Sequence, residues 1–202
     1  MSMPAPARHW TVDEVRAMQG EDRPWPRYEL IDGELLVTPA PRRLHQRAVA
    51  ELFLLVHPYV QAHRLGVTEF SPADIQLEPG TLVQPDLFVS PLLDGRVPLH
   101  WPETTRLVLA AEVISPSNPR TDRVTKRHFY TRVDVAEYWV IDLDARIIER
   151  NVGADPRPEI VDRTLSWDPA TATEPLVIDL PSYFARVFGE MDGSRRPLST
   201  FG

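Results

Sequence analysis

The spacing of apolar residues predicts two helices in the first third of the chain. Between residues 42 and 64, apolar side chains recur three and four positions apart, which is typical of a helix with one buried face. Pro58 lies inside this stretch and is expected to kink the helix. Nearer the amino terminus, Thr11 and Glu14 fit a capping box, so a short helix is expected through about Gln19.

Short apolar runs separated by turn residues predict a series of strands. Asp32-Gly33 divides the apolar runs of residues 28–37, which is a strong signal for a β-hairpin. Residues 107–114 are apolar except at Glu112, as expected for a central strand that is covered on both faces. The other expected strands are a short pair around Ser71-Pro72, the runs 83–89, 135–141 and 147–152, and weaker candidates near 160 and 177–178.

Two more helices are expected in the second half of the chain. Asn118 can cap a helix that begins at Pro119, where the missing proline amide costs nothing, and this helix would carry Lys126. A shorter helix is expected over 182–188, and the proline-rich residues 90–106 predict a surface excursion. Because the length suits one hydrophobic core, we expect a single domain over 1–193 and a flexible tail over 194–202.

Composition and charge exclude several classes of protein. The chain of 202 residues has no cysteine, which removes disulfides, thiolate catalysis and cysteine-bearing metal sites. The absence of cysteine favours the cytoplasm, and no apolar run reaches the length of a membrane span, so we expect a cytoplasmic protein with no membrane partner. The net charge of −7 argues against a general nucleic-acid coat protein, whose affinity rests on many contacts between basic side chains and phosphates.

Any contact with nucleic acid must therefore be local, and one basic stretch follows the expected central strand. Within residues 120–132, four arginines and a lysine surround a single acid, Asp122. Arg120, Arg123 and Arg127 are candidate contacts to DNA phosphates. The alternative is an ordinary solvated helix face, since charged helical stretches are usually of that kind.

Lys126 is the only lysine in the chain, beside 21 arginines. So strong a bias suggests that this position needs a compact ammonium with a tunable pKa rather than a planar guanidinium. Asp122, Lys126 and Tyr130 are four residues apart, so they share one face of the expected helix. The alternative is a surface ion pair between Asp122 and Lys126, worth about 0.3 to 0.5 kcal/mol.

Two carboxylates interrupt apolar strands and need partners there. Glu112 and Asp86 are costly to ionise in such surroundings unless cations or hydrogen-bond donors meet them. Pro85 precedes Asp86 and blocks a ladder hydrogen bond, which indicates a strand start or an irregularity. Two acids at neighbouring strand ends could bind a hard divalent cation such as Mg²⁺ or Mn²⁺.

Motifs spread over most of the chain are similar to those of one known family. In order, they are Tyr28-Glu29-Leu30-Ile31-Asp32-Gly33-Glu34-Leu35, His45, Pro85-Asp86, Glu112-Val113-Ile114-Ser115-Pro116-Ser117, Asp122, Lys126, Tyr130 and Glu137-Tyr138-Trp139-Val140-Ile141-Asp142. Together they resemble the Uma-two family of restriction-endonuclease-like proteins in the PD-(D/E)XK nuclease superfamily. The similarity covers roughly residues 10–190.

The resemblance implies an α/β, restriction endonuclease-like fold with a mixed central β-sheet flanked by helices. It also implies that Asp86 and Glu112 hold Mg²⁺ or Mn²⁺ and that Lys126 completes the catalytic set of a DNA-cleaving endonuclease. The superfamily signature has its lysine two residues after the second acid, where this chain has Ile114. The resemblance implies that the lysine comes instead from the following helix.

Four further residues are expected to support this site. The resemblance brings the hairpin near it, so Glu29 would complete the acidic cluster; the alternative is an outward-facing hairpin glutamate. His45 would contact a phosphate or transfer a proton, unless it is a packing residue. Asp122 and Tyr130 would support Lys126 from the same helix face.

The leading hypothesis is a metal-dependent endonuclease that hydrolyses DNA phosphodiester bonds. The alternative is a catalytically inactive nuclease-like module that binds nucleic acid or a protein partner, and a third possibility is hydrolysis of a smaller phosphoester. Duplex DNA offers two strands, so a homodimer is expected.

Overall fold

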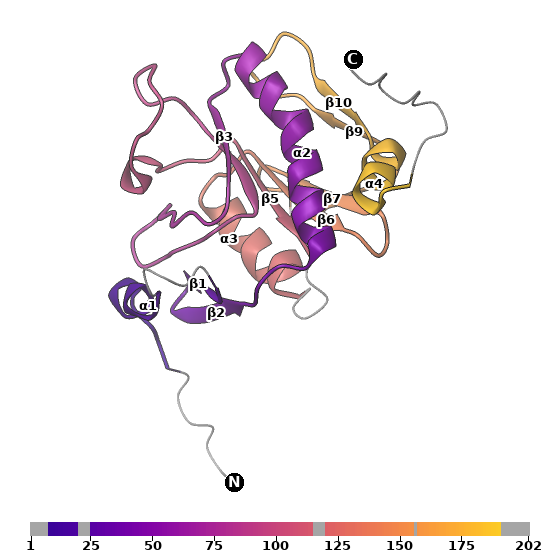
Figure 1. Cartoon of the computed structure of the whole chain (residues 1–202). Helices are drawn as coiled ribbons and strands as arrows, with labels where there is room; N and C mark the ends of the chain where they lie inside the picture. The colour runs from indigo at the N-terminus through magenta and orange to yellow at the C-terminus, as the bar shows by residue number, and fades with distance from the viewer. Residues whose placement is uncertain (1–7, 20–24, 115–119, 156, 191–202) are drawn as a thin grey trace, which may run out of the picture.

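The centre of the computed structural model, which describes residues 8–19, 25–114, 120–155 and 157–190, is a mixed β-sheet (Figure 1). Its six strands lie in the order β3 (Val67–Phe70), β4 (Leu87–Ser90), β5 (Leu109–Val113), β6 (Glu137–Asp142), β7 (Ile147–Val152) and β8 (Glu159–Val161). β5 and β6 are parallel, and the other neighbours are antiparallel. The expected mixed α/β sheet is confirmed, with β5 inside it.

Helices and hairpins cover both faces of this sheet. One face packs against α2 (Arg43–Ala62), α4 (Leu180–Phe188) and the hairpin of β9 (Thr164–Trp167) and β10 (Leu176–Asp179). The opposite face packs against α3 (Arg127–Arg132) and the hairpin of β1 (Arg27–Ile31) and β2 (Glu34–Thr38). Neighbouring residues of a strand point to opposite faces, so Trp139 packs toward α2 and Tyr138 toward α3.

Short helices complete the described elements. α1 (Val12–Met18) packs through Val15 on Leu30 of the first hairpin and begins with the expected capping box of Thr11 and Glu14. A single 3₁₀ turn, η1 (Trp101–Glu103), lies in the excursion between β4 and β5, and a π-helical segment, η2 (Thr121–Lys126), runs directly into α3. Within the described ranges, every helix is too short or too polar to span a bilayer.

Several expected boundaries differ from those of the structure. Of the two short strands expected around Ser71-Pro72, the first is present as β3, which ends at Phe70. The second is wrong, because residues 72–78 form only one isolated bridge, between Ile75 and Val83. The run 83–89 is a strand only from Leu87 onward. Pro85 offers no N–H to a ladder, and Leu82 pairs instead with Leu30 of the first hairpin.

The remaining expectations have mixed outcomes. The structure confirms the hairpin of residues 28–37, the long helix with Pro58 inside it and the expected strands after residue 107. The strand β9 was not expected from the sequence. The helix that carries Lys126 begins as the π-helical η2 rather than as an α-helix. Its expected cap, Asn118-Pro119, and the expected tail lie outside the described residues.

Candidate active site

Two acidic side chains lie at the ends of adjacent strands, on the face of the sheet that α3 covers. β4 and β5 are antiparallel, with Leu87 opposite Ala111. Continuing this register by one residue sets Asp86 opposite Glu112. The two side chains belong to residues that are 4% and 3% exposed. The structure thus brings together the two acids singled out in the sequence.

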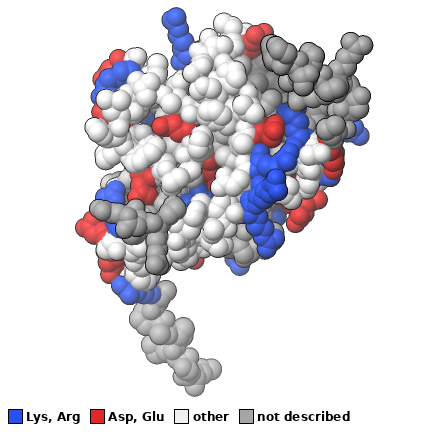
Figure 2. All heavy atoms as spheres, in the orientation of Figure 1, with Lys and Arg blue, Asp and Glu red and all other residues white. Residues whose placement is uncertain are grey.

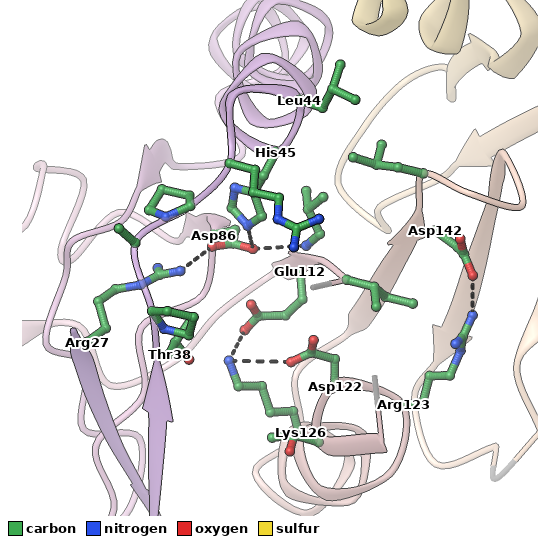
Figure 3. A pocket seen from close by; sticks show the side chains of 18 of the residues that line it. Arg27, Thr38, Leu44, His45, Asp86, Glu112, Asp122, Arg123, Lys126 and Asp142 are labelled. Atoms are coloured by element: carbon green, nitrogen blue, oxygen red, sulfur yellow. Dashed lines mark hydrogen bonds and ion pairs between the residues drawn. The ribbon is translucent and has the colours of Figure 1, made fainter. Parts of the chain in front are cut away.

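Asp86 is held by three groups (Figure 3). Its Oδ1 accepts a hydrogen bond from Nη2 of Arg27 at 2.8 Å, and its Oδ2 lies 2.9 Å from Nε2 of His45, in the first turn of α2. The backbone N–H of Val113 donates to the same Oδ2 at 2.9 Å, where the β4–β5 ladder has ended. Burial alone would raise the pKa of Asp86, but His45 and Arg27 hold it well below its usual range.

Lys126 reaches three carboxylates from the other side of the site. Its Nζ lies 2.8 Å from Oε1 of Glu112, 2.9 Å from Oε2 of Glu29 and 3.8 Å from Oδ1 of Asp122. The residue is 3% exposed, so the alternative of a solvated surface pair does not describe it. Figure 3 shows its side chain rising toward Glu112 and Asp122 from the helix below.

Aromatic and backbone groups fix this arrangement. The hydroxyl of Tyr130 donates to Oε1 of Glu112 at 3.4 Å, and that of Tyr138 donates to the backbone carbonyl of Asp122 at 2.9 Å. Oε1 of Glu29 accepts the backbone N–H of Gln84 at 2.8 Å. Glu29 therefore faces inward, as expected from the resemblance, and not outward as hairpin alternation allowed. A π-helical turn such as η2 is frequent at functional sites.

Above these groups the surface opens into a pocket of about 640 Å³. Asp86, Glu112, Asp122, Lys126 and His45 line it, so a ligand could reach them, whereas Glu29 lies behind Lys126 and does not line the pocket. A volume of this size is in the range of small-ligand sites.

The charges of the site do not balance. Burial alone would lower the pKa of Lys126, but Glu112 and the two other nearby acids raise it well above its ordinary value. Burial raises the pKa of Glu112 well above its usual range, although Lys126 opposes the shift. Four acids share two permanent cations, Lys126 and Arg27, so ionising all four is unfavourable without a further positive charge. A bound cation would favour the charged forms of Glu112 and Asp122.

Asp122 gives the site a pH dependence that can be measured. Burial raises its pKa to about 6, against the charge of Lys126. Between about pH 4 and 6 the folded state then binds a proton that the unfolded state has released, so folding stability falls as pH rises. We expect the Asp122→Asn variant to lack this component, so that its stability relative to the wild type rises by roughly 2 kcal/mol from pH 4 to 7.

Urea unfolding of both proteins across this pH range measures the effect. Asp162→Asn, which removes an exposed acid, is the control and should show no such trend. A difference between Asp122→Asn and wild type that stays constant with pH would contradict the assignment.

The three arginines expected to meet DNA lie in different settings. Arg123 donates to Glu149 and, at 2.6 Å, to Asp142, which neutralises its charge at the pocket edge. Arg120 is exposed and Arg127 is half-buried. Their contact with phosphates stays a prediction.

Sequence reasoning missed Arg27, which binds Asp86 from the first hairpin. Arg27 and Glu29 are two residues apart in β1 and are both buried. Side chains two apart in a strand point the same way, so once Glu29 is directed at the site, Arg27 follows from alternation.

The acids have the donor chemistry that Mg²⁺ or Mn²⁺ prefers. Mg²⁺ is commonly held by one or two carboxylates, with water and substrate oxygens in its other positions. Asp86 and Glu112 supply two such carboxylates beside a pocket. Within the part of the chain that the structure describes, no group of three or more potential ligands is arranged to hold a metal by itself. The donor set therefore fits a two-carboxylate site and not an all-protein cage.

Comparison with known proteins gives the family of this chain. Residues 12–163, more than half of the chain, match the model of the Uma2 (Uma-two) family, which is described as "Putative restriction endonuclease". The chain belongs to the Uma2 family. No curated protein matches it.

A solved structure shows the same fold as this Uma2 chain. It is described as a "putative nuclease belonging to DUF820 from Anabaena variabilis ATCC 29413" and superposes with a TM-score of 0.71. The match covers 88% of this chain and 99% of the other, at 18% sequence identity. At this identity the similarity establishes the nuclease-like fold alone. The reaction has to be inferred from the residues of the site.

Proposed function

We propose that this Uma2 protein is a metal-dependent endonuclease that hydrolyses phosphodiester bonds in DNA. The observation that carries the proposal is the convergence, in one pocket, of two buried acids from adjacent strands and the only lysine of the chain. The family description and the nuclease-like fold support the same conclusion.

Asp86 and Glu112 would hold Mg²⁺ or Mn²⁺. The cation would polarise a phosphoryl oxygen and lower the pKa of a bound water. The Lys126 ammonium would stabilise negative charge that develops on the phosphate, since a fixed cation in a buried site acts more strongly than one in water. Glu29 and Asp122 position this ammonium, while Arg27 and His45 orient the carboxylate of Asp86.

Hydrolysis of a labelled DNA oligonucleotide with and without Mg²⁺ or Mn²⁺ tests the proposal. We expect cleavage that stops on chelation of the metal and that falls at least about 100-fold in Glu112→Gln, with weaker Mn²⁺ binding by calorimetry. Glu137→Gln is a matched control, because Glu137 is also a buried strand glutamate paired with a cation, Arg150, but does not line the pocket. It should keep both activity and metal affinity.

The opposite result identifies the alternative function. If neither wild type nor Glu112→Gln cleaves DNA and Mn²⁺ does not bind at millimolar concentration, the chain is an inactive nuclease-like module. The expected homodimer stays a prediction, which sedimentation of the purified protein would check.

A further inference from the structure

The pocket above the reacting groups has largely apolar walls. One wall comes from β2 and the segment that leads into α2, and the other from the β6–β7 turn and the end of α4. The apolar side chains of the two sides are together called the apolar wall, and they are Leu36, Pro39, Pro41, Leu44, Leu143 and Phe188. Such a surface does not attract phosphates but suits the bases and sugars of a nucleic acid.

The reacting groups lie at the bottom of this pocket. Asp86, Glu112 and Lys126 are only 3 to 4% exposed, so a phosphate must descend between the walls to meet them. In an intact duplex the phosphates lie along a rod that stays stiff over about 150 base pairs. An unpaired strand can bend one nucleotide into the pocket, whereas a duplex must first be opened.

Basic side chains lie on one side of the pocket mouth. Arg27, Arg123 and Lys126 line the pocket but are each paired with acids. Arg42 and Arg43, at the start of α2, are exposed, and the first turn of this helix has no acid. Figure 2 shows basic side chains in a stripe over α4 and the adjoining amino-terminal end of α2.

The two elements beneath this stripe also reach the pocket. Arg42 and Leu44 of the α2 end and Phe188 of the α4 end line it, and Arg47 of α2 donates to the backbone carbonyl of Arg186 in α4. Arg186, the basic residue of α4, is paired with Glu51, so the arginines available to phosphates beside the apolar wall are Arg42 and Arg43. Proteins that bind single strands combine a basic groove for the backbone with aromatic side chains on which the bases stack, and Phe188 is the aromatic residue of the apolar wall.

We propose that the pocket takes an unpaired nucleotide, in single-stranded DNA or at an unpaired position of a duplex, in preference to intact duplex DNA. The base packs on the apolar wall, and the flanking phosphates follow the arginines of the α2 end. This assignment of substrate class rests on the proposed function. Its binding part, that the pocket prefers unpaired to paired DNA, is measured without hydrolysis. Among the residues that the structure describes, few exposed arginines lie at the mouth, which agrees with this preference, because a protein that binds a duplex commonly makes about six or more phosphate contacts.

Fluorescence anisotropy with the Glu112→Gln protein tests the preference without turnover. Three labelled DNAs of one sequence are compared: a single strand, a perfect duplex, and a duplex with one unpaired nucleotide. We expect the single strand and the interrupted duplex to bind at least about tenfold more tightly than the perfect duplex. Equal or tighter binding of the perfect duplex would overturn the inference.

A pair of leucines on α2 tests where the base packs. Leu44→Ser alters the apolar wall at a residue that is 41% exposed, and should weaken single-strand binding about fivefold. Leu54→Ser changes a residue of the same helix that is 64% exposed and away from the pocket, and should leave binding unchanged. Equal effects of the two substitutions, or none from Leu44→Ser, would contradict the placement of the base.

Hydrolysis separates this inference from the proposed function. Wild-type protein with Mn²⁺ is given the same three DNAs and a small chromogenic phosphodiester. If none is hydrolysed while the binding preference persists, the proposed function fails and the inference stands. If the perfect duplex is bound as tightly and cut as fast as the single strand, the inference fails and the proposed function stands.

Discussion

Replacing Lys126 with methionine is expected to lower DNA hydrolysis by about 100-fold to 1,000-fold, the usual cost of removing one fixed group that stabilises transition-state charge. The same change leaves Glu29 and Glu112 buried without their shared cation. Breaking a buried ion pair on one side costs about 3 to 5 kcal/mol of folding free energy. The loss of stability should be larger at pH 8 than at pH 5, because Glu112, whose pKa is already raised by burial, can take up a proton at the lower pH.

The control for Lys126→Met must reproduce the structural damage without touching the site. Arg150→Met does so, since Arg150 pairs with the buried Glu137 through Nη2 at 2.7 Å and Nε at 2.8 Å. Unfolding in urea should show both variants to be destabilised, while hydrolysis per folded molecule falls only in Lys126→Met. Lys126→Arg should recover part of the stability but little activity, because a guanidinium does not occupy the place of a compact ammonium. Equal activity losses in Lys126→Met and Arg150→Met would show that Lys126 acts only through folding.

Much of the secondary structure was predictable because its signals are local. The Asp32-Gly33 hairpin, the capping box of Thr11 and the apolar runs after residue 107 all carry their structure within a few residues. The strand around Pro85 was misjudged because its outcome depends on distant partners. Leu82 pairs with Leu30, more than fifty positions away, and this pairing takes the segment out of the central sheet.

The candidate site was predictable in its members but not in its connections. The costs of burying Asp86 and Glu112 in apolar strands showed that each needs a partner. Spacing by four placed Asp122 and Tyr130 with Lys126 on one helix face, and the side chains do converge, although the turn that carries Lys126 is π-helical. Periodicity could not show that Arg27 is a partner of Asp86, because the two residues lie 59 positions apart in the sequence and in different strands or loops.

Tertiary context also decides which basic residues are available to a ligand. In the sequence, Arg123 and Arg127 look like the centre of a phosphate-binding stripe. In the structure, Glu149 and Asp142, on the two strands that follow, surround Arg123. The exposed arginines beside the pocket come instead from the start of α2. The apolar spacing of this segment predicts its buried face and says nothing about the arginines on its exposed end.

Replacing Asp86 with asparagine is expected to lower DNA hydrolysis at least about 100-fold and to weaken Mn²⁺ binding at least tenfold. The asparagine keeps the shape of the side chain but loses its charge, and its amide nitrogen can only donate. Arg27, His45 and the Val113 N–H all approach the two carboxylate oxygens, so one of them would face another donor or remain without an acceptor. Arg27 is 5% exposed, and leaving it without its counter-ion should cost about 3 kcal/mol of folding free energy.

Asp74→Asn provides the matched comparison for Asp86→Asn. Asp74 is a half-buried carboxylate that accepts hydrogen bonds from Gln84 at 2.8 Å and Gln19 at 3.3 Å, and it does not line the pocket. Burial raises the pKa of Asp74, so its neutral amide replacement should be tolerated with hydrolysis and Mn²⁺ affinity unchanged. Calorimetric titration with Mn²⁺ measures the metal affinity of both variants, and the oligonucleotide assay measures their rates of hydrolysis. If Asp86→Asn binds Mn²⁺ as well as wild type yet loses activity, Asp86 acts by orienting Arg27 and His45 and not by holding the cation.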